Sequence, residues 1–192
     1  FKNSDVYFNE AIQLIEKSKY KAGLLSLIYK IDADLILIGN YRKAIEYLFV
    51  LKKLSEKLEF HEQTSVIINS IGIIYWQQGN PNQALLLYSE NLALIKRTGI
   101  KGDLAAAYNN IGLAYRQLNQ LKRAVAFYTK SLQMCIANND YRSQANAYNN
   151  LGTIYQLEGN YMKALYYHNK SLEIRMNVGD SIGISMSLGN MG

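Results

Sequence analysis

The residue types that most often carry chemistry are few in this sequence. His61 and His168 are its only histidines, and they lie far apart in the chain. The single cysteine, Cys135, has no second cysteine for an internal disulfide and no histidine at a zinc-ligand spacing. The sequence has no phosphate-binding loop, nucleophile elbow or metalloprotease helix, and its carboxylates do not recur in close pairs. We therefore predict that these residues form no enzyme, no metal site and no cofactor site.

Amide side chains, in contrast, recur at a constant separation, which we call the repeat period. One series consists of Asn69, Asn109 and Asn149, each 40 residues after the one before it. The next position in each period holds Ser70, Asn110, Asn150 and Asn190. An asparagine both donates and accepts hydrogen bonds, so a row of them can pair with the backbone of an extended peptide. The alternative is that these asparagines bond to neighbouring helices and stabilise their packing, because a weak helix former recurs only for a reason.

The same repeat period extends to small and aromatic residues, which indicates an internal repeat. The segments 69–75, 109–115 and 149–155 read NSIGIIY, NNIGLAY and NNLGTIY. Within each period, apolar residues recur at helical intervals. Gly79, Asn119 and Gly159 are placed to end one helix in the left-handed conformation, and Pro81 suits the start of the next. Each period therefore predicts a pair of helices.

The turn residues also predict where these helices lie. We expect first helices of the pairs at about 63–78, 103–118, 143–158 and from 181 onward, and second helices at about 81–97, 121–137 and 161–177, each bound to within ~2–4 residues. Asp140 and Asp180 are placed to cap two of the first helices. A further second helix is expected at 41–58 and its degenerate partner at 20–38, where Asp32 replaces the glycine. His168 takes the register position of Tyr88 and Tyr128, which favours an aromatic substitute in the packing.

These spacings resemble the tetratricopeptide repeat (TPR), in which a glycine and an aromatic of the first helix face an alanine and an aromatic of the second. Gly112, Tyr115, Ala124 and Tyr128 carry the pattern here. We expect the small residues to let two helix backbones approach. The repeat period, which is longer than the roughly 34 residues of ordinary repeats, is similar to the extended variety of kinesin light chains, Pins-type adaptors and bacterial sensory proteins. The resemblance implies an all-α, right-handed superhelical solenoid of helical hairpins.

On this basis the chain is expected to form a single solenoid over residues 1–192. Residues 1–19 are the remnant helix of a preceding repeat, and residues 20–62 are a degenerate repeat. The regular repeats are 63–102, 103–142 and 143–180, and 181–192 is a truncated next repeat.

In the family's solenoid the first helices line a concave surface, so the resemblance implies a binding groove along them. The residues expected to contact a peptide or protein partner are Asn69, Asn109, Asn110, Asn149, Asn150, Asn146, Leu113, Trp76, Arg116 and Gln156. A buried, gap-filling role is the alternative for the tryptophan. The lysines and arginines of the dicarboxylate clamp found in chaperone-binding relatives are missing from the corresponding positions.

Composition and charge narrow the class of partner. The chain is 49% hydrophobic and 19% charged, as in a folded protein. Its net charge of +6 is thinly spread, since residues 1–62 carry ten basic against nine acidic side chains and residues 63–192 carry eleven against six. Cations near helix ends, Lys96, Arg97 and Arg175 among them, are expected to complement helix dipoles. We predict no nucleic-acid partner, no membrane insertion and a cytoplasmic location, because no long apolar run or signal peptide occurs.

The sequence thus predicts a scaffold module that binds an extended or short helical segment of a partner. The alternative is a sensory region that responds to a peptide and controls an attached kinase, cyclase or transcription regulator. Self-association through the C-terminal repeat is also expected, because Met186, Leu188 and Met191 would present apolar surface there.

Overall fold

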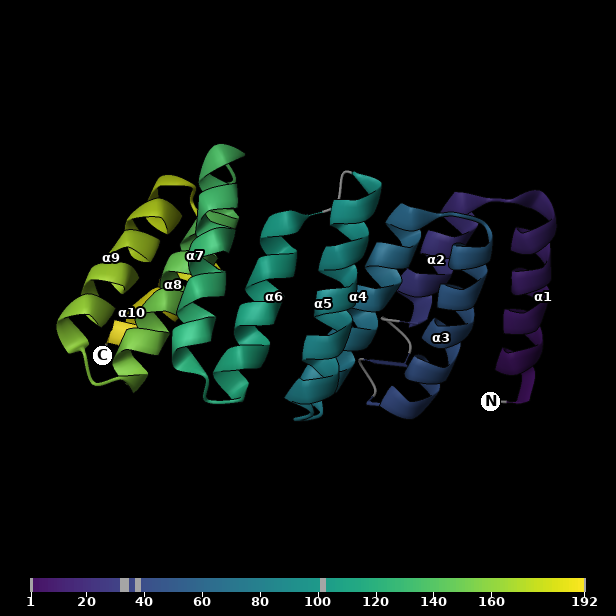
Figure 1. The fold of residues 1–192 in the computed structure, drawn as a ribbon, viewed down its shortest axis with the longest axis horizontal. Coiled ribbons are helices and arrows are strands. Elements are labelled where there is room, and N and C mark those ends of the chain that lie inside the picture. Colours follow the sequence, from purple (N-terminus) through teal and green to yellow (C-terminus); the bar gives the residue numbers. More distant parts are fainter. Residues whose placement is uncertain (1, 32–34, 37–38, 101–102, 192) are drawn as a thin grey trace. The chain divides into compact units, whose positions relative to one another are not determined.

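The computed structural model describes residues 2–31, 35–36, 39–100 and 103–191, and this part of the chain is helical with no β-strand. The helices group into two compact units, residues 1–102 and 103–192 (Figure 1). The first unit contains α1 (Lys2–Ser18), α2 (Lys21–Ile31), α3 (Tyr41–Lys57), α4 (His61–Gln77) and α5 (Pro81–Thr98). The second contains α6 (Leu104–Gln117), α7 (Leu121–Ala137), α8 (Tyr141–Leu157), α9 (Tyr161–Asn177) and α10 (Ser181–Met191). The all-α fold expected from the periodicity is confirmed.

Each predicted helix of the regular repeats is present, and its ends follow from the turn residues. Gly79, Asn119 and Gly159 have φ angles of 73°, 56° and 73°, so each takes the left-handed conformation that ends a helix. Asp140 accepts a hydrogen bond from the backbone N–H of Ser143 at 3.0 Å, and Asp180 accepts one from that of Gly183 at 3.0 Å. Two starts differ from the expectation of 63 and 143, because α4 begins at His61 and α8 begins directly after its cap, Asp140.

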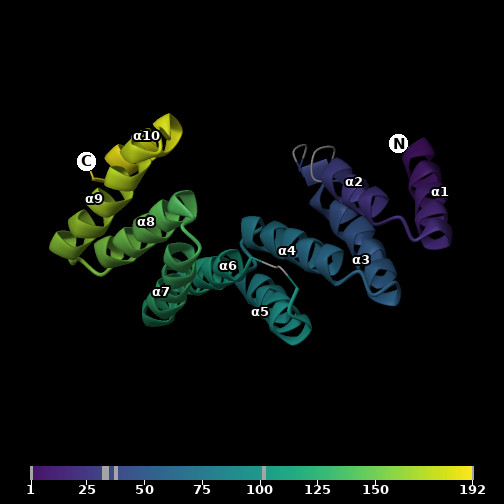
Figure 2. The same ribbon diagram turned by 90° about the horizontal axis from the view of Figure 1, so that it is seen from above.

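Paired helices pack where a glycine meets a ring. In both views α8 and α9 lie side by side (Figures 1 and 2). A Cβ atom added to Gly152 would lie 2.7 Å from the His168 ring, and one added to Gly112 would lie 2.6 Å from the Tyr128 ring. Gly72 stands in the same relation to Tyr88, at 2.5 Å. The glycines were expected to let helix backbones approach, but the nearest atoms are ring atoms. The space left by each missing side chain therefore holds the aromatic residue of the second helix.

His168 takes the place of a tyrosine, as expected. It is 1% exposed, and its Nδ1 lies 3.2 Å from Oδ1 of Asn149. Burial lowers the pKa of its imidazole from the ordinary value of 6.5. For the Tyr128 hydroxyl, which is neutral when protonated, burial has the opposite effect and raises the pKa to about 12. Both rings are therefore uncharged parts of the core at neutral pH.

The first unit has a core of large aliphatic side chains. Its fully buried members include Leu24, Ile28, Leu48, Leu51 and Ile67, and burying each stabilises the fold by about 1.5–3 kcal/mol. Helix α1 contacts α3 through Phe8, whose ring stacks on that of Tyr47 with the ring centroids 3.9 Å apart. The degenerate partner predicted at 20–38 is described only in part: α2 ends at Ile31, and Asp32 lies outside the described residues.

The C-terminal helix, α10, leaves several large apolar side chains exposed. Ile182, Met186 and Leu188 are 78%, 58% and 52% exposed. The side chains of Asn190 and Met191 lie outside the described residues. Among the helices that the structure describes, none combines the length and the apolar character that crossing a bilayer requires.

Candidate functional site

The recurring asparagines of the second unit lie on α6 and α8, where they form hydrogen bonds between the two first helices. Asn150 of α8 donates from Nδ2 to Oδ1 of Asn109 on α6 at 2.8 Å. Asn109 in turn donates from Nδ2 to Oδ1 of Asn110 at 3.3 Å. All three side chains are half-buried. The structure therefore brings Asn109, Asn110 and Asn150 together as one network, which we call the amide network.

The amide network leaves part of the hydrogen-bonding capacity of Asn150 unused. Its Nδ2 carries two protons and donates one to Asn109. Within the described part of the chain, Asn150 makes no other hydrogen bond. One N–H group and the Oδ1 atom thus remain for a ligand, and a peptide group needs one acceptor and one donor of this kind.

Asn149 turns toward its own hairpin instead. Its Oδ1 atom lies 3.2 Å from the buried ring of His168 on α9. This contact joins α8 to α9, which is the alternative role expected for the asparagines: bonding to a neighbouring helix and stabilising its packing. Asn109 has a packing role as well, because it holds Asn150 from the neighbouring helix.

Asn146, one turn before Asn150 on α8, is exposed, and its side chain is hydrogen-bonded to an arginine. Arg175 donates from Nη2 to Oδ1 of Asn146 at 2.8 Å, and from Nη1 to the carbonyl of Gly183 and to Oγ of Ser187 at 2.5 and 3.0 Å. Arg175 is 3% exposed. Burial lowers the pKa of its guanidinium, while the negative charge of Asp180 acts in the opposite direction. The bond to Arg175 engages the Oδ1 atom of Asn146, and its NH2 group is the donor that a ligand could use.

Arg175 corrects the expectation drawn from its place near the end of a helix. It does not complement the helix dipole from the surface, because it is buried and joins α8, α9 and α10. The repeat period contained the signal: the equivalent positions are Ser55, Ile95 and Cys135, and all three are buried.

Beside Asn146 the surface is hollowed between α6 and α8. The hollow has a volume of about 180 Å³. It is lined by small or short polar side chains: Ala105, Ala106, Asn109, Ser131, Ser143 and Asn146. Ser131 of α7 closes its floor by donating to the carbonyl of Ala105 at 2.8 Å. A hollow of this size and polarity accommodates a small polar side chain next to the amide network.

The remaining predicted residues lie along the same helices or in the other unit. Leu113 is half-buried against the core of the second unit. Arg116 is half-buried and close enough to Tyr128 to lower that hydroxyl's pKa slightly, while Gln156 is exposed. Asn69 and Trp76, both half-buried, lie on α4 in the first unit. The second unit therefore contains all the predicted contact residues except these two.

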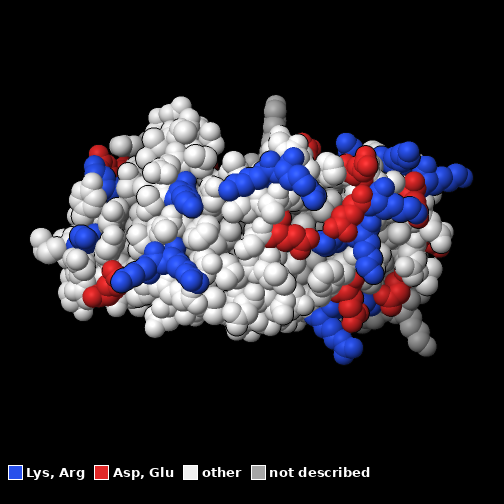
Figure 3. Space-filling view, viewed as in Figure 1, with Lys and Arg blue, Asp and Glu red and all other residues white. Residues whose placement is uncertain are grey.

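The distribution of charged and titratable side chains bears on nucleic-acid and metal binding. On the face shown in Figure 3, basic and acidic side chains intersperse over the first unit without a continuous basic stripe. In the part of the chain that the structure describes, no three His, Cys, Asp or Glu side chains group closely enough to hold a metal ion. Cys135 is buried, and burial raises the pKa of its thiol.

Comparison with known proteins identifies the repeat. A family model described as tetratricopeptide repeat matches residues 63–137 and 143–192. The fold is similar to that of BtubC (BKLC) from P. vanneervenii, with a TM-score of 0.84 and 21% identity over 99% of this chain and 79% of that one. A putative kinesin light chain repeat protein from Podosopora anserina gives a TM-score of 0.66 and 18% identity, with 93% and 91% of the two chains covered.

A third similar structure belongs to a multidomain protein. It is a signal transduction ATPase with numerous domains and a tetratricopeptide repeat sensor, from Pyrococcus horikoshii, with a TM-score of 0.68 and 19% identity. The match covers 97% of this chain but 32% of that protein. No curated protein sequence matches the chain.

Proposed function

Because the chain belongs to the tetratricopeptide repeat family, we propose that it is a protein-interaction module whose first helices bind an extended segment of a partner polypeptide. The proposal rests most directly on the amide network of α6 and α8. There Asn150 is held by Asn109, and one donor and one acceptor of its amide have no partner among the residues that the structure describes. Proteins of this family usually bind other proteins, which agrees with that chemistry.

The geometry supports a ranking of the predicted contacts. Asn150 is the principal backbone contact, and Asn110, next to Asn109 in the network, is the second. Asn109 and Asn149 act mainly by orienting their neighbours, since their oxygens are engaged by Asn150 and His168. Asn146 presents its NH2 group toward a carbonyl of the bound segment, because Arg175 occupies its oxygen.

Specificity comes from side chains around these amides. The hollow beside Asn146 takes a small polar side chain of the partner. Leu113 offers a limited apolar contact, and Arg116 and Gln156, one period apart, contact the partner's side chains at the far end of the helices. Asn69 and Trp76 would perform the corresponding contacts in the first unit.

A sensory role is the second candidate. It is favoured by the likeness to a protein that carries a repeat sensor attached to a signalling ATPase. In that case the same peptide contacts would regulate a neighbouring domain of the full-length protein. The order of domains in the full-length chain distinguishes the two, because a sensor requires an output domain. The cytoplasmic location expected from the sequence stays a prediction.

A displayed library of random peptides, selected on the immobilised chain, would supply a ligand for the test. We expect Asn150→Ala to weaken a selected peptide about tenfold, because two hydrogen bonds of roughly 0.5–1.5 kcal/mol each are lost. Asn169→Ala is the matched control, since Asn169 is an exposed asparagine in the interior of α9. If both variants bind the peptide as tightly as the wild type, the amide network is not the binding site.

A further inference from the structure

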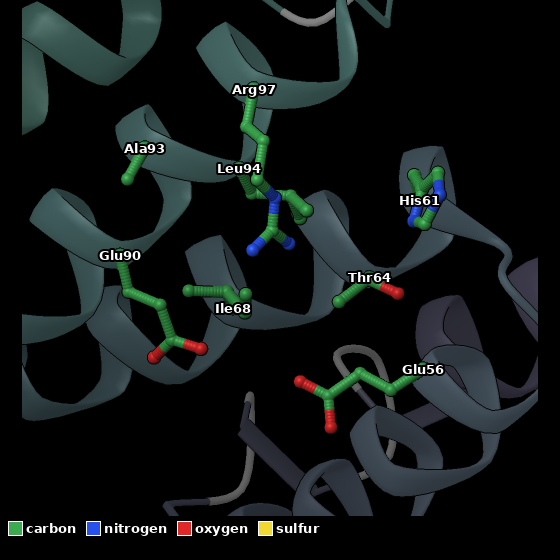
Figure 4. Close-up of a pocket in the computed structure, with 8 residues that line it drawn as sticks. All are labelled: Glu56, His61, Thr64, Ile68, Glu90, Ala93, Leu94 and Arg97. Atoms are coloured by element: carbon green, nitrogen blue, oxygen red, sulfur yellow. The ribbon is translucent and has the colours of Figure 1, made fainter.

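A large hollow of the first unit lies among α3, α5 and the first half of α4, and neither Asn69 nor Trp76 lines it. Its volume is about 520 Å³. Figure 4 shows the residues that line it: Glu56, His61, Thr64, Ile68, Glu90, Ala93, Leu94 and Arg97. Binding pockets for small ligands and side chains measure roughly 300–1,000 Å³, so this hollow is large enough for an occupant.

Beside the hollow, aliphatic residues replace an aromatic pair of the other hairpins. In the second unit, the positions one and two periods after Ile68 and Leu87 hold rings. There Tyr108 lies 6.1 Å from Phe127, and Tyr148 lies 6.2 Å from Tyr167, between ring centroids. These rings fill the space between the first and second helices of their hairpins. In the first unit the smaller Ile68 and Leu87 take these positions, and Ile68 lines the hollow.

The second unit also shows what surrounds a ring at this position. The ammonium group of Lys130 lies 5.8 Å from the centroid of Tyr108 and 5.2 Å from that of Phe127. A cation over the face of an aromatic ring is attracted by the ring's quadrupole. The position of Lys130 is taken by Glu90 in the first unit, so a cation for a ring there must come from another residue.

Arg97 is suited to supply it. Its guanidinium is turned into the hollow, toward the space between Ile68 and Thr64 (Figure 4). It makes no hydrogen bond or ion pair with any residue that the structure describes. The two carboxylates of the rim are engaged elsewhere, because Lys52 binds both Glu56 and Glu90 at 2.8 Å. The guanidinium is therefore available to stack on an inserted ring.

We propose that this hollow binds the aromatic side chain, tyrosine or phenylalanine, of a partner polypeptide. The ring takes the place that Tyr108 and Tyr148 occupy in their own hairpins, against Ile68 and Leu94, with Arg97 over its face. The site shares no residue with the amide network, because all its lining residues belong to α3, α4 and α5 of the first unit, and it gives the module a second contact.

N-acetyl-L-tyrosinamide is the probe, with N-acetyl-L-leucinamide as the non-aromatic comparison. In protein NMR spectra at about 10 mM probe, we expect saturable shifts of the backbone amides of Thr64, Ile68, Ala93 and Leu94. The tyrosine derivative should bind about two- to tenfold more tightly than the leucine derivative. Shifts that do not saturate, or that map elsewhere, would overturn the proposal.

Filling the hollow should prevent binding. Ile68→Tyr restores the ring of the other hairpins and is expected to abolish the saturable shifts, whereas Val66→Tyr, on the same helix but outside the hollow, should leave them. Ala93→Trp covers the hollow from an exposed position and serves as a second blocking variant if Ile68→Tyr disturbs folding. Arg97→Gln should weaken binding about two- to fivefold, and Arg142→Gln, at an exposed arginine of the other unit, should not.

Two further comparisons identify the source of the ring and separate this site from the groove. A tripeptide with capped ends, Ala-Tyr-Ala, should bind at least as tightly as the tyrosinamide, and tighter binding of free tyrosine would contradict a polypeptide partner. Asn150→Ala should leave the tyrosinamide shifts unchanged. If it removes them, the probe binds at the amide network and the hollow is not a site of its own.

Discussion

The contact between Gly112 and Tyr128 determines what a single methyl group does to the stability of the second unit. A Cβ atom on Gly112 would lie 2.6 Å from Cε1 and 2.7 Å from Cδ1 of the Tyr128 ring, whereas ordinary contacts begin at 3.4 Å. The ring is 0% exposed, so it has no open space to move into. Gly112→Ala gains about 1 kcal/mol in helix propensity but overpacks the core at a cost of about 1–3 kcal/mol. We expect a net loss of roughly 1 kcal/mol.

Urea unfolding followed by circular dichroism measures this loss. Gly189→Ala is the matched control, because Gly189 lies within α10 and an added Cβ there would meet nothing within 4 Å. That variant should be as stable as the wild type or slightly more stable. In a Tyr128→Ala background, Gly112→Ala should become stabilising, because the colliding ring is gone. A Gly112→Ala protein more stable than the wild type would refute the account of the glycine column.

Three further predictions concern the second unit. Burial holds the pKa of His168 in the folded protein below 6.5, so the unfolded chain binds the proton first and the folded wild type loses stability as the pH drops below 6.5. His168→Tyr should remove this loss between pH 7 and 5, and wild-type urea midpoints that stay unchanged over this range would contradict the prediction. Arg175→Met should leave the free energy of unfolding unchanged or raise it by about 1 kcal/mol, because the buried guanidinium lacks a carboxylate partner within 4 Å among the described residues. A fall in the free energy of unfolding of more than about 3 kcal/mol would show that the hydrogen bonds of Arg175 outweigh the cost of burying its charge. The exposed Ile182, Met186 and Leu188 should produce concentration-dependent dimers in sedimentation experiments, weakened by Met186→Glu, and a monomer at high concentration would rule out association through α10.

The helices were predictable because their ends are determined locally. Left-handed Gly79 and Asn119 and the capping Asp140 act on the backbone within a few residues, so their types and spacing are enough. The start of α8 was expected at about 143 and lies close to it, directly after the cap Asp140. The type of contact at Gly112 was missed, since only coordinates distinguish a ring from a backbone as the neighbour.

The candidate site was predictable only as a set of positions. The repeat period placed Asn110 and Asn150 on neighbouring first helices, but which amide bonds to which depends on side-chain rotamers. Asn149 illustrates the difference, because it has the same residue type and spacing as Asn109 but turns toward His168. Arg175 was misjudged because its charge was weighed above its buried register position.

The most direct test of the proposed function is to map a bound peptide on the second unit. A peptide selected from the displayed library would be added to isotope-labelled protein, and the backbone and side-chain amide shifts would be followed by NMR. Our account predicts saturable shifts of the side-chain amides of Asn110, Asn146 and Asn150, with α7 and the outer face of α9 unaffected. Saturable binding that shifts the amides of α7 and α9 but leaves Asn150 unchanged would contradict it.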